Sequence, residues 1–280
     1  MYFFKHFSMT QTTFSSSKRS STISINFIVP QSWPDMSDKQ LRYVYQLIAQ
    51  DFAIDEVKTL FLLKWSGAKV IGRQDSGAYL MKFGKTLFEV TPLTLAELLT
   101  NLDWLGQPPT VPVRPSKLNR RVALPADFQG VPFESFIVCD NYYQGYLQTQ
   151  QEYLLDEMGR VMYQDAKLNF SPWQRVAILY WMVALKDLFA RQFPDFFVRV
   201  ASEAPYGDDF QPAGSATDGN LLGSTPASVE ASMNAQIRAL TKGDVTKEAE
   251  VLALDTWRAL TELNAQAKEY KELNAKTKAK

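Results

Sequence analysis

The sequence has very few of the side chains that enzymes use most often for proton transfer and metal binding. Its 280 residues include a single histidine, His6, and a single cysteine, Cys139. One cysteine excludes a disulfide within the chain, and one histidine with one cysteine cannot supply the ligands of an ordinary zinc site. A histidine base would have to be His6, which lies in a stretch that we predict to be disordered, whereas catalytic groups need preorganisation. Cys139 follows an apolar run, so we predict a buried, unreactive thiol.

The chain also lacks an excess of charge, a phosphate-binding loop and a long apolar run. Thirty lysines and arginines balance thirty aspartates and glutamates, which removes the general electrostatic case for binding nucleic acid or an anionic membrane. No GxxxxGK[ST] or GxGxxG pattern follows a strand-like segment. The most apolar helical stretch, residues 176–185, is half the length needed to span a bilayer. We therefore expect a soluble cytoplasmic protein, with association with a virion as the alternative.

What the chain does contain is enough apolar material for a sizeable core. Hydrophobic residues make up 46% and aromatic residues 13%, which excludes wholesale disorder. The patterns predict an α+β fold that is mainly α, with a small antiparallel sheet plus helices in the N-terminal unit and a helical C-terminal unit. The predicted divisions are a disordered leader (1–22), a mixed α+β domain (23–106), a proline-rich basic connector (107–132), a helical domain (133–200), a flexible loop (201–225) and C-terminal helices (226–280).

The N-terminal unit is predicted from its periodicities. Residues 23–29 read as a strand, and residues 68–91 as an antiparallel meander that it could join. Ser37 and Gln40 form a capping box at the start of an amphipathic helix, onto which Trp33 is expected to fold back. Further helices are expected over residues 54–65 and, from a Thr94 cap, as far as Gly106.

The proline-rich connector and the helices that follow it are also predicted from local sequence patterns. Residues 107–132 contain six of the 14 prolines and four basic residues with no acidic residue between them, so the segment is predicted to be extended and to mark a domain boundary. We expect it to stay solvated or to dock on an acidic surface of its own chain; nucleic-acid binding is the less favoured alternative. The basic residues are Arg114, Lys117, Arg120 and Arg121. Helices are predicted over residues 133–149, 151–164, 171–192, 225–243 and 246–280.

Aromatic and apolar side chains in the C-terminal unit suggest surfaces for partners. Tyrosine buries its ring while its hydroxyl stays hydrated, so a surplus of it is typical of binding surfaces. The last helix carries an apolar seam that must pack on something, and its final turns extend past any expected core. We therefore predict contacts with other proteins, or self-association through the C-terminal helices, with the following candidate residues: Tyr142, Tyr146, Trp257, Leu260, Leu263 and Tyr270.

One short motif carries a resemblance to known proteins. The pattern Trp33–x3–Ser37–x2–Gln40 before an apolar helix is similar to openings of phage tail-assembly chaperones, and this segment together with residues 233–273 resembles uncharacterised proteins encoded in prophage regions of bacterial genomes. The resemblance implies a structural or assembly role and transfers no catalytic residue.

These observations favour a non-enzymatic interaction or assembly protein of phage or prophage type, without a cofactor, a metal site or a membrane partner. The alternative is an enzyme that uses carboxylates and a divalent metal in a cleft between the two units. Asp208 and Asp209 are the most suggestive acidic pair for it, although adjacent carboxylates in a polar loop are usually solvated.

Overall fold

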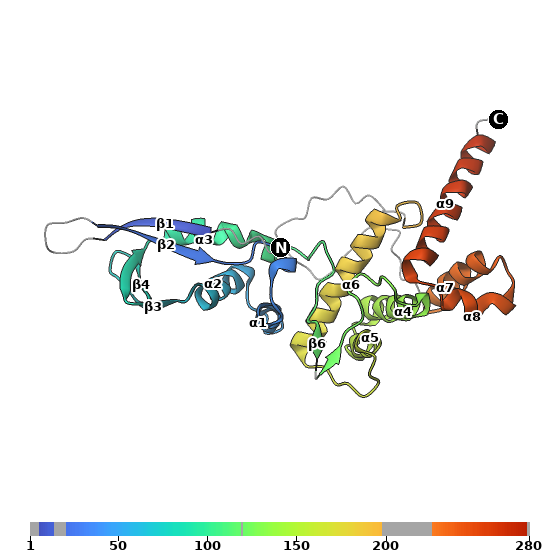
Figure 1. Cartoon of the computed structure of the whole chain (residues 1–280), viewed down its shortest axis with the longest axis horizontal. Helices are drawn as coiled ribbons and strands as arrows, with labels where there is room; N and C mark the ends of the chain where they lie inside the picture. The colour runs from blue at the N-terminus through green and yellow to red at the C-terminus, as the bar shows by residue number, and fades with distance from the viewer. Residues whose placement is uncertain (1–5, 14–20, 119, 198–225, 279–280) are drawn as a thin grey trace. The chain divides into compact units, whose positions relative to one another are not determined.

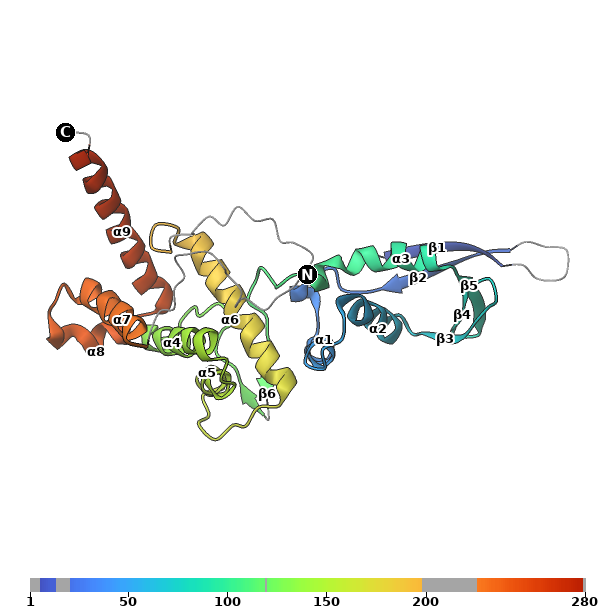
Figure 2. The same ribbon diagram turned by 180° about the vertical axis from the view of Figure 1, so that it is seen from behind.

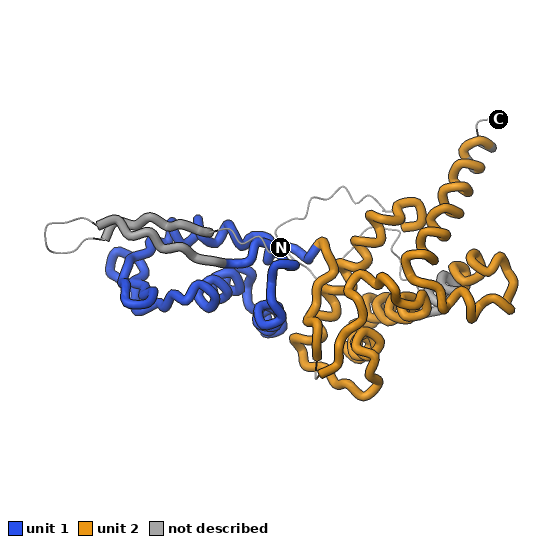
Figure 3. The backbone as a smooth tube through the Cα atoms, in the orientation of Figure 1, with its two compact units in different colours: residues 1–109 blue, residues 110–280 orange. Residues whose placement is uncertain are grey.

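The structure, a computed structural model, describes residues 6–13, 21–118, 120–197 and 226–278. The chain divides into two units, Met1–Pro109 and Thr110–Lys280 (Figure 3). The fold is mainly helical, with a small antiparallel three-stranded sheet in the first unit and a helical second unit, as the sequence predicts. Each unit is described by itself below.

The first described segment of unit 1 is a β-hairpin rather than part of a disordered leader. Strand β1 (His6–Thr13) pairs antiparallel with β2 (Ser21–Ile28), from His6 opposite Ile28 to Thr13 opposite Ser21. The prediction of disorder is therefore wrong for residues 6–13, because a polar stretch rich in β-branched threonine can still pair through its backbone. The expected strand 23–29 forms, but β2 pairs with β1 and lies outside the meander. Residues 1–5 and 14–20 lie outside the described part of the chain.

An aromatic cluster fixes the start of helix α1 (Asp38–Ile48), which follows the 3-10 turn η1 (Trp33–Asp35). The Ser37 amide donates to the Gln40 side-chain oxygen at 2.9 Å, which is one half of the predicted capping box. Trp33 folds back as expected, and its ring stacks on that of Tyr45 with centroids 5.6 Å apart. Its indole N–H donates to the Gln107 carbonyl at 2.9 Å, so the cluster ties the beginning of the unit to its end.

The sheet of unit 1 lies between two helices in the sequence. Helix α2 (Ile54–Ser66) ends at Gly67, whose φ of 75° favours glycine. Strands β3 (Ala68–Arg73), β4 (Tyr79–Phe83) and β5 (Thr86–Val90) follow as an antiparallel meander in the order β3-β4-β5.

Helix α3 (Pro92–Leu99) and the 3-10 turn η2 (Thr100–Gly106) complete unit 1. The cap of α3 is Thr91 rather than the predicted Thr94: the Thr91 hydroxyl accepts the Thr94 amide at 3.1 Å. Pro92 can then occupy the first helical turn, where no amide hydrogen is needed.

Unit 2 is a set of helices preceded by the short strands β6 (Lys117–Leu118) and β7 (Arg121–Val122). Figure 1 and the reverse view in Figure 2 show how these helices follow one another. Their bounds are α4 (Phe133–Thr149), α5 (Tyr153–Tyr163), α6 (Pro172–Gln192), α7 (Pro226–Thr241), η3 (Val245–Lys247), α8 (Glu248–Leu252) and α9 (Thr256–Lys278). The helices predicted before residue 200 form within a few residues of their expected ends, and α6 begins after Ser171 as predicted.

The predicted continuous helix over residues 246–280 is interrupted between α8 and α9. The Leu254 carbonyl accepts the Phe133 amide at 2.7 Å, and the Thr256 amide donates to the Val131 carbonyl at 2.9 Å. These two hydrogen bonds use the Leu254 carbonyl and the Thr256 amide, which would bond within the helix if it were continuous. Sequence periodicity could not reveal the break, because the partners lie more than 120 residues away.

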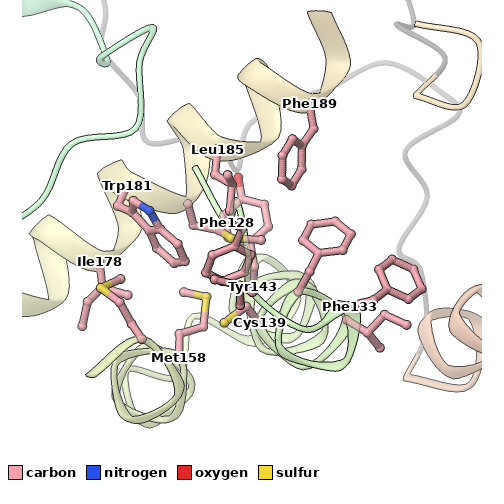
Figure 4. Packing of buried hydrophobic residues seen from close by; sticks show 14 of the residues in the cluster. Phe128, Phe133, Cys139, Tyr143, Met158, Ile178, Trp181, Leu185 and Phe189 are labelled. Atoms are coloured by element: carbon pink, nitrogen blue, oxygen red, sulfur yellow. The ribbon is translucent and has the colours of Figure 1, made fainter. Parts of the chain in front are cut away.

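The core of unit 2 is aromatic and continuous from α4 to α9. Figure 4 shows side chains from α4, α5 and α6 meeting around Trp181 and Phe128, both 0% exposed. The packing leaves no spare volume at Gly159, where a Cβ would lie 2.5 Å from the Phe170 ring. Leu260 of α9 belongs to the same buried cluster.

The proline-rich segment is part of this core rather than a free connector. Phe128 is fully buried, and the backbone that precedes it accepts hydrogen bonds from aromatic side chains of the helices. The donors and acceptors are Tyr163 Oη to the Pro115 carbonyl at 2.9 Å, Trp181 Nε1 to the Ala126 carbonyl at 2.8 Å, and Trp257 Nε1 to the Asp127 carbonyl at 2.7 Å. The boundary between the units therefore falls at residue 109, and the helical domain and the C-terminal helices belong to one unit.

Candidate interaction surfaces

The apolar seam of α9 begins inside the core of unit 2. Leu260 is 0% and Leu263 is 3% exposed. Trp257 is half-buried, and its ring lies edge-on to those of Phe189 and Phe193 at centroid distances of 5.8 and 5.5 Å. All three predicted partner-binding residues pack on the chain's own helices, and Leu260 and Leu263 are buried there.

Beyond Leu263 the same helix leaves the core. The Asn264 side-chain oxygen accepts the amides of Asp195 and Phe196 at 2.8 and 3.0 Å, and Lys271 pairs with Asp195 at 3.1 Å. After these contacts Tyr270 is 68% exposed, as the sequence predicts for a binding residue. Figure 1 shows this end of α9 running past α7 and α8.

The spacing along α9 makes its exposed end a continuation of the buried seam. Leu260, Leu263, Ala267 and Tyr270 are separated by three, four and three residues, so they lie along one face of the helix. The stripe is buried at its start, half-buried at Ala267 and open at Tyr270. Leu273, one turn further, is 63% exposed. We define the C-terminal end of α9 as residues 267–278.

Tyr142 and Tyr146 lie together on α4, one helical turn apart, and form the second surface. Both are half-buried against the core cluster, and the structure places Tyr153, which is 56% exposed, at the start of the next helix. Burial raises the pKa of Tyr142 and of Tyr146, and the nearby charge of Glu157 or Glu152 adds to the rise. The hydroxyl groups of Tyr142 and Tyr146 therefore stay protonated at neutral pH.

The carboxylates near these tyrosines are neutralised by arginines. Arg175 donates to both Asp156 oxygens at 2.7 and 2.9 Å and also pairs with Glu152. Arg160 pairs with Glu157. Hydrogen bonding to Asp156 raises the pKa of Arg175 despite the opposing effect of burial. The pairs made by Arg175 link α6 to the start of α5.

One basic residue of the proline-rich segment, Arg121, pairs with an acidic residue of its own chain, which is one of the two outcomes predicted for this segment. Arg121 donates to Asp165 at 2.8 Å. A hydrogen bond from the Lys167 amide, with this guanidinium as a further cause, lowers the pKa of Asp165. Lys117 and Arg120 are exposed, and Arg114 is half-buried. The four basic residues therefore differ in their exposure and do not form one continuous exposed basic surface.

Cys139 lies in the core, as predicted from its apolar neighbours. Its side chain is 0% exposed, and burial, together with the charge of Asp140, raises the pKa of the thiol. The thiolate is therefore almost absent at neutral pH, and the residue has neither the acidity nor the access of a nucleophile.

We expect the Cys139 thiol to react with a thiol reagent at least ~100-fold more slowly in the native protein than in denaturant, because the core must open first. A raised folded-state pKa stabilises the protein below the unfolded value and loses that effect above it. The free energy of unfolding should therefore fall as the pH rises above 9.0, the thiol's ordinary pKa. Denaturant titrations at several pH values should show a smaller fall for Cys139→Ala, and an equal fall would contradict this assignment.

The alternative, an enzyme that uses carboxylates and a divalent metal, needs several ligand side chains close together, and the described residues do not contain such a cluster. Asp208 and Asp209 lie outside them, and His6 is in strand β1. Within residues 6–13, 21–118, 120–197 and 226–278, no three histidine, cysteine, aspartate or glutamate side chains lie close enough to hold a metal ion. A cavity between Tyr163, Phe170 and Trp173 has a volume of only about 10 Å³, room for one water molecule.

Comparison of the chain with protein-family models, with characterised proteins and with solved structures gives no match. None of the helices in the described ranges is long and apolar enough to cross a membrane. The function must therefore be argued from the surfaces above. Sequence reasoning missed two exposed residues of these surfaces: Leu273, hidden among lysines and glutamates, and Tyr153, whose only signal was its place in a tyrosine-rich stretch.

Proposed function

We propose that this protein acts by binding other protein chains rather than by catalysis, and that the C-terminal end of α9 is its main contact. The observation that carries the proposal is the apolar stripe that leaves the core after Leu263 and continues, exposed, through Tyr270 and Leu273. A helix gains little by extending such a stripe into water, whereas a second helix laid along it would bury both side chains.

The occupant that we propose is the same segment of a second copy. Lys268, Glu269, Lys271, Glu272 and Lys276 surround the stripe with both signs of charge. Two such helix ends can pair without general repulsion and can exchange ion pairs across the contact. A strongly acidic partner would be repelled by the glutamates of this segment, and a strongly basic partner by its lysines.

The tyrosines of α4 and α5 supply a second contact in this proposal. Tyr142, Tyr146 and Tyr153 offer large rings with hydroxyl groups, the kind of side chain that is enriched where proteins bind one another. A molecule with two separate contact surfaces can link more than two copies, which suits an assembly role. The resemblance to phage tail-assembly chaperones and prophage-encoded proteins agrees with such a role in the cytoplasm or the virion.

The proposal predicts that Tyr270→Glu together with Leu273→Glu abolishes concentration-dependent self-association. Charges placed on the stripe would have to be desolvated in the contact, which weakens association by at least about 100-fold. Light scattering over a range of protein concentrations measures the effect. A full chain that is monomeric at high concentration would refute self-association through α9.

The matched control is Lys268→Glu with Glu272→Lys, which changes two charges on the same stretch of helix but leaves the stripe intact. We expect this variant to associate within a few-fold of the unchanged protein. Both variants should keep the melting temperature, since Tyr270 and Leu273 contribute little burial within the unit. If the control variant loses association to the same extent, the apolar stripe is not the contact surface.

A further inference from the structure

Unit 1 carries opposite charges at the two ends of helix α2. Near its start, an open depression of about 390 Å³ is lined by Phe52, Asp55, Glu56, Thr59 and Leu60. Beyond its end, the outward face of the meander carries lysines in neighbouring positions. Neither surface belongs to the contacts proposed above for unit 2.

The surface at the start of α2 is acidic and partly apolar. Asp55 and Asp103 share the same partner, Lys58, at 3.2 and 2.8 Å, while Glu56 caps the helix by accepting the Ala53 amide at 3.0 Å. Lys58 is only 11% exposed in its side chain, whereas those of Asp55 and Asp103 are 82% and 64% exposed. The negative charge therefore faces solvent, and the compensating lysine does not.

Exposed apolar side chains lie beside this negative charge. Phe52 and Ile54 are 37% and 38% exposed, and Phe52 itself lines the depression. A surface that combines exposed apolar side chains with carboxylates that outnumber their one lysine partner fits a partner that is both basic and apolar. We call residues 52–60 the acidic surface.

The outward face of the meander has those properties. Lys69 of β3 lies directly opposite Lys82 of β4, which in turn lies opposite Leu87 of β5. All three are exposed, Leu87 to 52%, and Lys85 follows in the β4–β5 turn. Like charges directly opposite one another weaken a sheet, so an acidic partner on this basic face would relieve a repulsion that the isolated unit carries.

The two surfaces cannot neutralise each other within one molecule. Helix α2 has 13 residues, which at 1.5 Å per residue separates its ends by about 20 Å. That distance exceeds the reach of a lysine side chain, and the Debye length at physiological salt is only about 8 Å. The complementary charges can meet only between two copies.

We propose that unit 1 is a head-to-tail contact, in which the acidic surface of one copy binds the basic face of another. The two surfaces differ, so the contact is heterologous, and each copy keeps one free surface of each kind for the next. Such contacts build a ring or an open filament rather than a closed dimer. This contact is independent of the pairing of α9 ends.

The test uses the full chain carrying Tyr270→Glu and Leu273→Glu, so that the α9 contact does not contribute, and sedimentation velocity at about 50 and about 500 mM salt. We expect oligomers that grow with protein concentration at low salt and dissociate at high salt. Lys82→Glu and Glu56→Lys should each weaken association at least about tenfold. Lys39→Glu and Glu97→Lys, the same charge changes at other exposed sites of unit 1, should have little effect.

A mixture of the Lys82→Glu and Glu56→Lys variants tests the head-to-tail contact most directly. Lys82→Glu retains a working acidic surface and Glu56→Lys a working basic face, so an equimolar mixture should form a one-to-one dimer and nothing larger. If Glu56→Lys lowers the melting temperature, Glu56→Gln keeps a capping oxygen while removing the charge, and it replaces that variant. A monomeric parent at low salt, a mixture without dimer, or controls that weaken association as strongly would overturn the proposal.

Discussion

Replacing Trp181 with alanine is expected to lower the free energy of unfolding of unit 2 by about 3–5 kcal/mol. The side chain is 0% exposed, and its ring meets that of Phe128 at a centroid distance of 5.4 Å. Its indole N–H also donates to the Ala126 carbonyl. The substitution therefore opens a cavity and releases the proline-rich segment from α6, two effects that add to one another.

Two variants on the same helix separate these effects. Trp181→Phe keeps most of the ring but leaves the Ala126 carbonyl without its donor, so it should cost about 1–3 kcal/mol. Trp173→Ala removes an indole that is only half-buried and should cost less than Trp181→Ala. Urea unfolding followed by far-ultraviolet circular dichroism measures all three, and a loss at Trp181 no larger than that at Trp173 would contradict the packing described here.

Ending the chain at two different points of its C-terminal part should give opposite results. A chain that ends at Ala253 loses the burial of Leu260 and Leu263 and the bond from Trp257 to the proline-rich segment. Each buried leucine is worth roughly 2–5 kcal/mol, and a domain's whole stability is about 5–15 kcal/mol. Unit 2 should then unfold. A chain that ends at Ala267 keeps all of these contacts and should stay folded.

Thermal melts followed by circular dichroism distinguish the two truncations. We expect the chain ending at Ala267 to melt within a few degrees of the full chain and to lose its self-association. The chain ending at Ala253 should lose the transition of unit 2. A cooperative transition of unit 2 in this shorter chain would show that α9 is not part of the core.

Local signals predicted the helices well because their causes are local. Ser37 with Gln40, Gly67, and Ser171 with Pro172 mark helix ends by chemistry that acts within one turn. The buried faces of these helices also follow from spacing alone. Cys139 could be placed in the core because its neighbours in the sequence are apolar.

The errors came from contacts between residues far apart in the sequence. The break after α8 depends on Val131 and Phe133, and the proline-rich segment is held by Trp181 and Trp257, none of which a local pattern connects. Prolines suggested a linker because they prevent regular structure, yet the same backbone has carbonyl groups free to accept bonds from aromatic side chains. Strand β1 escaped notice because much of the segment around it is polar, whereas its partner β2 was recognised from its apolar alternation.

The candidate surfaces were predictable only in part for the same reason. The seam of α9 was recognised, but sequence spacing cannot show where a core ends. Leu260 and Leu263 are inside it, Trp257 packs half-buried against it, and Tyr270 is outside it. Tyr142 and Tyr146 were identified by composition, whereas the pairing of Glu152 and Glu157 with arginines required the fold.

Cross-linking through a single introduced cysteine tests the central claim, pairing of the α9 stripes, most directly. Cys139 is buried, so a short bismaleimide should report only on the new thiol. Ala267→Cys places that thiol on the stripe, whereas Glu272→Cys places it about 140° around the helix from Ala267 and on the side away from Tyr270. The account predicts covalent dimers from Ala267→Cys and few from Glu272→Cys at the same protein concentration. Equal yields from the two positions, or no dimer from Ala267→Cys, would contradict it.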